Sequence, residues 1–160
     1  MEKATLSDKQ PVPSVPMLCI SARALLLFLC LGATAQAGDW PMWRYDASHT
    51  AASPERLGDN LTLHWTRQLA PVEPSWPKQP RLCFDAGYEP IVMDDFIYVP
   101  SMVSDSVTAF DTQTGAEIWR FYADGPVRFA PVGSKGRIYF VSDDGFLYCV
   151  GAATGTLIWR

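Results

Sequence analysis

The sequence Ala-Phe-Asp-Thr-Gln-Thr-Gly-Ala-Glu-Ile-Trp spans Ala109 to Trp119, and a related sequence follows further along the chain. The second copy, Cys-Val-Gly-Ala-Ala-Thr-Gly-Thr-Leu-Ile-Trp, spans Cys149 to Trp159. The Thr-Gly pair and the tryptophan both recur after 40 residues. An Ile-Tyr pair at Ile97 recurs after 41 residues, so the first copy has one extra residue in its loop. The chain therefore contains an internal repeat.

Each copy contains four short apolar runs separated by turn residues, which predicts four β-strands per unit. The expected strands are 89–93, 96–99, 106–111 and 116–121 in the first unit, and 128–132, 137–141, 146–150 and 156–160 in the second. A period of about 40 residues with four strands is typical of a β-propeller blade. The predicted fold class is all-β: two complete units, each a four-stranded antiparallel meander, of a larger β-propeller. Because an isolated meander leaves apolar faces bare, we expect the chain to be an N-terminal fragment that lacks the remaining blades.

Turn chemistry explains several of the polar residues in these units. The glycine of each Thr-Gly pair lies between the third and fourth expected strands, where a positive φ favours glycine. The pairs Asp94-Asp95 and Asp143-Asp144 could be taken for calcium ligands. Both pairs fall at expected hairpin turns, where aspartate is favoured because it hydrogen-bonds nearby backbone. We therefore interpret them as turn residues.

The N-terminal part of the chain predicts export. Arg23 precedes a short apolar core, Ala24 to Leu31, and Ala35-Gln36-Ala37 is a small-x-small cleavage site. Residues 1–37 are thus predicted to be a signal peptide, and translation starting at Met17 is our hypothesis. The expected location is periplasmic or extracellular. The apolar core is too short to span a bilayer, so no stable membrane span is expected after cleavage.

Two segments precede the repeat units, which are assigned to residues 89–121 and 122–160. Residues 38–60 are predicted to be an extended arm whose aromatic side chains, Trp40 and Trp43, pack on the folded body. In residues 61–88, the alternation from Leu61 to Leu69 predicts a half-buried lone strand, and a proline-rich surface connection follows.

Few residues in the sequence indicate catalysis or metal binding. The net charge is −4 and no run of lysine or arginine occurs, so no nucleic-acid partner is expected. His49 and His64 are isolated from other metal ligands. Cys83 and Cys149 remain after the leader and could form a disulfide. Because Cys149 occupies the repeat position of Ala109, a buried free thiol is the favoured interpretation. No catalytic, cofactor-binding or metal-binding residue is predicted.

The pattern Ala-x-Asp-x-x-Thr-Gly-x-x-x-Trp resembles the repeat of PQQ-like (pyrroloquinoline-quinone-like) β-propellers, within the quinoprotein alcohol dehydrogenase-like superfamily. The resemblance covers about residues 38–160. It implies that each tryptophan docks between adjacent blades against small and glycine positions of the motif. The structural docking residues are then Ala109, Gly115, Trp119, Cys149, Gly155 and Trp159. The second copy departs from the pattern at Cys149 and at Gly151, which replaces the Asp111 of the first copy.

The resemblance implies two functions of different kinds. Some members of the family are non-catalytic scaffolds that bind proteins, and others are quinoprotein dehydrogenases that bind PQQ and calcium. The sequence has no vicinal cysteine pair such as many of the dehydrogenases carry. We therefore expect a secreted or periplasmic interaction scaffold that has cell-envelope or secreted proteins as partners and no cofactor. The alternative is a fragment of a PQQ-dependent dehydrogenase, which would need PQQ and calcium.

Overall fold

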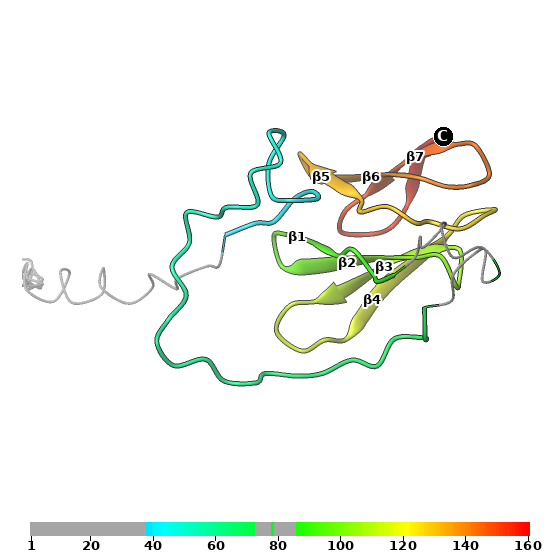
Figure 1. Ribbon diagram of the computed structural model, residues 1–160. Coiled ribbons are helices and arrows are strands. Elements are labelled where there is room, and N and C mark those ends of the chain that lie inside the picture. Colours follow the sequence, from blue (N-terminus) through cyan, green and yellow to red (C-terminus); the bar gives the residue numbers. More distant parts are fainter. Residues whose placement is uncertain (1–37, 73–77, 79–85) are drawn as a thin grey trace, which may run out of the picture. The chain divides into compact units, whose positions relative to one another are not determined.

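The computed structural model describes residues 38–72, 78 and 86–160, and the predicted leader lies outside these residues. Within them the structure is all-β, with two four-stranded antiparallel sheets (Figure 1). The first sheet contains β1 (Ile91–Met93), β2 (Phe96–Ser101), β3 (Ser106–Asp111) and β4 (Glu117–Tyr122). The second contains β5 (Val132–Ser134), β6 (Arg137–Val141), β7 (Leu147–Gly151) and β8 (Leu157–Trp159). Strand order follows chain order in both sheets, so each sheet is a meander, as predicted.

A shared apolar core joins the two sheets. The first sheet contributes Tyr98 and Val107, and the second contributes Ile138 and Tyr148, all of them buried. The aromatic ring of Phe121 in β4 lies edge-on to the rings of Phe140 in β6 and Tyr148 in β7. The face of the first sheet that carries Tyr98 is therefore covered by the second sheet, as expected for neighbouring repeat units.

The predicted strand at residues 128–132 is wrong, because β5 begins at Val132 and ends at Ser134. Ser134 pairs with Arg137, which leaves a two-residue hairpin loop. Both loop residues, Lys135 and Gly136, have positive φ, as a type I′ turn requires. Proline at 131 has no N–H to give to a strand ladder, so pairing starts only after it. The turn signal from Gly133 to Gly136 was therefore placed correctly, but its first two residues belong to the strand.

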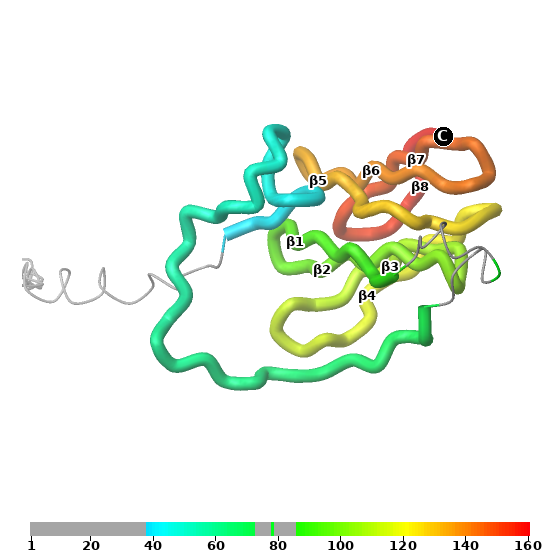
Figure 2. The backbone as a smooth tube through the Cα atoms, viewed as in Figure 1, coloured from blue at the N-terminus to red at the C-terminus, as the bar shows by residue number. Residues whose placement is uncertain are grey.

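The predicted lone strand at Leu61 to Leu69 is also wrong. The segment contains no regular strand, and Leu61 and Leu63 are exposed. Alternation alone cannot form a strand without a neighbouring strand to accept its backbone hydrogen bonds. In Figure 2 the segment runs as an open loop beside β4. Most of the predicted proline-rich connection that follows lies outside the described residues.

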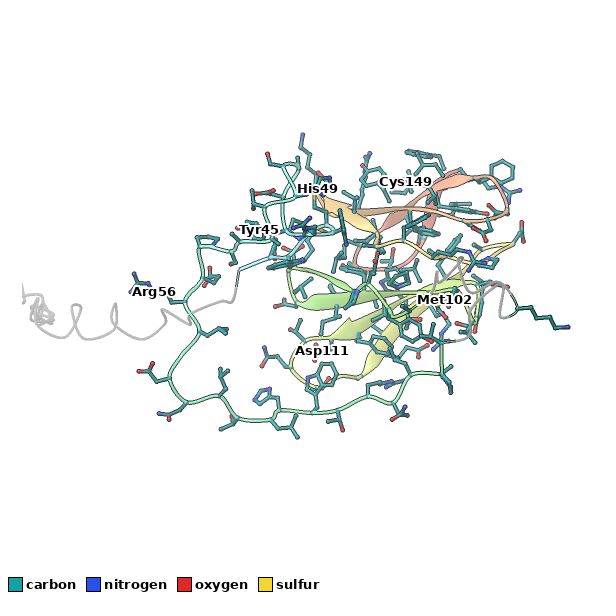
Figure 3. The ribbon with its side chains drawn as sticks, in the orientation of Figure 1. Tyr45, His49, Arg56, Met102, Asp111 and Cys149 are labelled. Atoms are coloured by element: carbon teal, nitrogen blue, oxygen red, sulfur yellow. The ribbon has the colours of Figure 1, made fainter. Side chains whose placement is uncertain are left out.

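The arm at residues 38–51 binds the first strand of each sheet. Trp40 exchanges two backbone hydrogen bonds with Val92 in β1, with N···O distances of 2.8 and 2.9 Å. Gly133 N–H in β5 donates to Pro41 O at 2.7 Å. Trp40 is partly buried, with its ring 5.3 Å from that of Tyr45 in the same arm, and Trp43 is 48% exposed, so the arm is held to the sheets by backbone hydrogen bonds. Figure 3 labels Tyr45 and His49 in this arm. None of the described residues lies in a helix that could cross a membrane.

Candidate functional site

The residues with the clearest structural role form a contact between the two sheets, which we call the Trp119 junction. The indole ring of Trp119 in β4 lies against Gly155, in the turn between β7 and β8. A Cβ atom at Gly155 would stand only 2.6 Å from the nearest ring carbon. The indole N–H donates to Ala152 O at 2.8 Å. Trp119 is partly buried, and its ring needs a glycine opposite it.

A second contact has the same geometry and involves a tryptophan that the sequence analysis did not assign. The indole ring of Trp65 lies against Gly115, where an added Cβ would stand 2.7 Å from the ring. Its N–H donates to Thr112 O at 2.9 Å. Thr112 and Gly115 precede Ala152 and Gly155 by 40 residues. This Trp65 junction therefore repeats the Trp119 junction one unit earlier. The sequence feature that could have predicted this contact is a tryptophan within an alternating run before the first unit.

Both glycines at these junctions have the backbone conformation that the Thr-Gly motif predicts. The φ angles are +68° at Gly115 and +67° at Gly155. A left-handed conformation disfavours other residues, and the adjacent indole ring leaves no space for a side chain. The glycine is thus required both for the turn and for the close approach of the ring.

The turn of the first unit is held by Asp111, which is labelled in Figure 3. Its carboxylate accepts hydrogen bonds from Thr114 Oγ1 and Thr114 N, each at 2.7 Å, and from Gln113 N at 3.1 Å. These bonds, chiefly those from Thr114, lower the pKa of Asp111. The second unit has Gly151 in this position, so its turn lacks the carboxylate.

The outer face of the second sheet corresponds to the covered face of the first sheet but is exposed. Trp159 is 42% exposed, and its ring lies 6.1 Å from that of Tyr139. Trp119 and Tyr98 have the same arrangement at 5.8 Å. We call this surface the open face. Its large exposed side chains are those of Val132, Val141, Leu147 and Trp159.

Ala109 and Cys149 occupy equivalent positions beneath these tryptophans. Ala109 pairs with Trp119, and Cys149 pairs with Trp159 in the neighbouring strand. Both small residues are fully buried, and Cys149, labelled in Figure 3, carries a free thiol. Cys83 lies outside the described residues. The structure therefore brings Ala109 and Trp119 together with Gly155 across one junction, whereas Cys149 and Trp159 lie on the open face.

Both pairs of carboxylates lie at hairpin turns. Asp94 and Asp95 form the turn between β1 and β2, and Asp94 N–H donates to an Asp39 carboxylate oxygen. Asp143 forms an ion pair with Arg128 at 2.6 Å. Asp144 accepts hydrogen bonds from Asp124 N and Phe146 N. Asp143 and Asp144 thus bind their own turn and the segment just before β5, whereas Asp94 is bound through its backbone N–H by the arm.

The described residues do not supply a cradle for calcium. Among residues 38–72, 78 and 86–160, no three histidine, cysteine, aspartate or glutamate side chains are close enough to hold a metal ion. His49 packs against Trp43 with ring centres 5.1 Å apart, and His64 is exposed. Neither histidine therefore belongs to a group of metal ligands among the described residues.

A cavity of about 180 Å³ lies beside the Trp65 junction. Its lining includes the segment after Trp65 and the face of the first sheet that points away from the second. The lining residues important here are Arg67, Leu69, Tyr88, Thr108, Phe110 and Arg120. Arg67 lies over the ring of Phe110, with 4.7 Å between its Cζ and the ring centre. The lining is therefore mixed, with apolar walls and two guanidinium groups.

Comparison with known proteins supports the repeat assignment. A family model described as outer membrane protein assembly factor BamB matches residues 33–160. The 1-butanol dehydrogenase (cytochrome c) of Thauera butanivorans is 27% identical over 170 residues, which cover 92% of this chain and 22% of that protein. The chain thus spans less than a quarter of the length of this curated relative.

Two solved structures show partial similarity at 17% sequence identity. A europium-containing methanol dehydrogenase has a TM-score of 0.40, with 44% of this chain and 14% of that chain covered. BamB from Moraxella catarrhalis has a TM-score of 0.38, with 41% and 20% covered. The family model covers far more of the chain than either of these. With two meanders repeated in register, the chain belongs to the family of PQQ-like β-propeller repeat proteins whose model is described as outer membrane protein assembly factor BamB.

Proposed function

We propose that the chain is part of an exported, non-catalytic β-propeller that binds other proteins of the cell envelope. The observation that carries this proposal is the open face. Leu147, Val141 and Trp159 are each between 42% and 48% exposed on one side of a well-formed sheet. A contiguous apolar surface of this kind marks a site of protein contact. The partner that fits the open face is the next blade of the same propeller, and the completed propeller would then present its remaining surfaces to envelope or secreted proteins.

The use of the carboxylates by local structure supports the scaffold proposal. Asp111 and Asp144 are each occupied by hydrogen bonds within or beside a turn. Asp46 accepts hydrogen bonds from Ser48 N, Thr50 N and Thr50 Oγ1, which lower its pKa, with the Thr50 hydroxyl contributing most. Each of these groups stabilises a loop in its ionised form. None of the three is a carboxyl group held protonated, as a general acid would be.

A dehydrogenase is the second candidate, and the similarity to 1-butanol dehydrogenase (cytochrome c) favours it. Under this alternative the chain would form one sector of a propeller whose other sectors supply the ligands of PQQ and calcium. The described residues would then provide walls and blade contacts only.

Titration of the purified chain with PQQ and calcium distinguishes these functions, with tryptophan fluorescence and alcohol-dependent dye reduction as readouts. The scaffold proposal predicts neither saturable quenching nor dye reduction, both for the chain and for the product of the extended gene. Stoichiometric PQQ binding, or dye reduction by the extended product, would establish the dehydrogenase instead. Calcium without PQQ is the matched control.

Site-specific crosslinking in cells tests the interaction surface. In the product of the extended gene, a photocrosslinker at Leu147 should crosslink to the next blade of the same propeller, and Val141→Lys should abolish this crosslink. A photocrosslinker at Val103, which is 44% exposed in the first unit but outside the open face, is the matched control. Equal crosslinking from both positions would contradict the proposal. Mass spectrometry of the same cells tests export, for which the expected mature N-terminus is Gly38.

A further inference from the structure

The two tryptophan junctions follow one plan but are filled differently. In each, the residue two positions after the tryptophan points at the facing sheet. At the Trp119 junction this residue is Phe121, whose ring contacts Phe140 and Tyr148 at centroid distances of 5.7 and 5.5 Å. At the Trp65 junction it is Arg67, which lies over Phe110. The aromatic filling of one junction is thus replaced by a guanidinium group in the other.

The sheet that faces each tryptophan differs in the same way, because a polar residue at the Trp65 junction takes the place of an aromatic residue at the Trp119 junction. Tyr148, which fills the Trp119 junction, has Thr108 as its equivalent 40 residues earlier. Thr108 is only 5% exposed, yet its hydroxyl has no hydrogen-bond partner among the described residues. Every fully enclosed polar side-chain atom among the described residues has a hydrogen-bond partner. The unpaired Thr108 hydroxyl is therefore not fully enclosed, and it opens into the cavity that Thr108 lines. A ligand in the cavity would therefore find the Thr108 hydroxyl free to form a hydrogen bond with it.

The charges around the cavity favour an anion. Arg67 and Arg120 line it, and none of the described lining residues is a carboxylate. Glu117 binds both guanidinium groups from outside the lining, at 3.4 Å from Arg67 and 2.7 Å from Arg120. Among these described residues, one negative charge against two positive charges leaves one positive charge in excess. Arg67 uses two of its five N–H groups in hydrogen bonds to described residues, one to Gly115 O and one to Glu117.

We propose that this cavity binds a small organic carboxylate. The carboxylate group would accept hydrogen bonds from Arg67 and from the Thr108 hydroxyl, because guanidinium groups bind carboxylates strongly. The short hydrocarbon chain of the ligand would lie against Phe110 and Leu69, which form apolar walls. The Trp119 junction has no such site, because aromatic rings occupy the corresponding space. This binding site is independent of the scaffold function.

Calorimetric titration of the 160-residue chain with pentanoate tests this site, and pentanamide is the neutral ligand of the same shape. Pentanoate should bind saturably at one site, and pentanamide should bind at least about tenfold more weakly. Thr108→Val removes the hydroxyl and keeps the shape of the side chain, and it should weaken pentanoate binding about tenfold. Absence of saturable pentanoate binding to the wild type would overturn the proposal.

Arg160→Gln is the matched control for location, because Arg160 is the repeat equivalent of Arg120 and lies outside the cavity. It should leave pentanoate affinity unchanged. The indole N–H signal of Trp65 in a nitrogen–proton spectrum should shift on pentanoate binding, and in Thr108→Val without ligand it should stay in place if the fold is intact. Equal affinity of Thr108→Val and wild type, with the Trp65 signal in place, would refute the site.

Discussion

The covered face of the first sheet and the open face of the second have the same design and differ in solvent exposure. Val107 and Ile91 are fully buried, whereas their repeat equivalents Leu147 and Val132 are 48% and 38% exposed. The tyrosine–tryptophan arrangement is nevertheless preserved, with ring distances of 5.8 and 6.1 Å. The open face therefore takes the docking arrangement before any sheet covers it. A further sheet packed on the open face would remove water from it, and this would stabilise the protein by about 1.5–3 kcal/mol for each large apolar side chain that becomes fully buried.

The largest difference between the two faces should appear on removal of their tryptophans. Trp119→Ala removes an indole ring packed on Gly155 and its hydrogen bond to Ala152 O. We expect it to lower the free energy of unfolding by about 3–5 kcal/mol. Trp159→Ala removes a ring that is 42% exposed and should cost only about 1 kcal/mol. Urea denaturation followed by circular dichroism measures both. Equal losses would contradict the assignment of Trp119 as the docking residue.

A smaller effect is expected from filling the space that receives the ring. Gly155→Ala places a Cβ 2.6 Å from the Trp119 ring at a residue with φ of +67°. It should destabilise the protein by about 2–4 kcal/mol, because the overpacking adds to the backbone cost. Gly136→Ala is the control: its φ is +70°, but nothing lies within 4 Å of an added Cβ. It should cost about 1 kcal/mol. Thermal unfolding of both variants separates the cost of overpacking from the cost of the left-handed backbone conformation.

The Asp111 turn should make stability depend on pH. Its pKa is lowered in the folded state, so its contribution is fully present above the unfolded pKa of about 3.9 and is lost as pH falls through the folded value. The Tm of Asp111→Asn should therefore lie below that of wild type at neutral pH, and the two should converge in strong acid. The second unit has Gly151 at this position, so no carboxylate there contributes to the pH dependence of stability. A Tm difference that is constant with pH would disprove the assignment.

The smallest effect is a gain. Gly151→Asp restores the turn carboxylate to the second unit, and the added Cβ would lie 3.0 Å from Thr154 Oγ1. Thr154 is the repeat equivalent of Thr114, which donates to Asp111 in the first unit. We expect an increase of about 1 kcal/mol in the free energy of unfolding, measured by urea denaturation. Gly151→Asn should give a smaller increase, and a loss in both variants would show that the two turns differ in backbone geometry.

The repeat could be predicted from the sequence because its signals are local. The Thr-Gly turn fixes a positive φ at Gly115 and Gly155, and the 40-residue period fixes which strands correspond. The role of Trp65 was not predicted, because it depends on a contact with Gly115, which lies 50 residues away in sequence. The start of β5 was misplaced because apolar residues before Pro131 have the same alternation as a strand. The cavity could not be predicted, because no local pattern shows that Arg67 takes the place at the Trp65 junction that Phe121 takes at the Trp119 junction.

Hydrogen exchange of the indole N–H groups tests the central claim, that each tryptophan docks on the Thr-Gly turn of the following unit. Trp65 and Trp119 donate to Thr112 O and Ala152 O, whereas the Trp159 indole has no acceptor among the described residues. We therefore predict slow exchange for Trp65 and Trp119 and fast exchange for Trp159. Equally fast exchange of all three would show that the junctions do not hold in solution and would contradict the account.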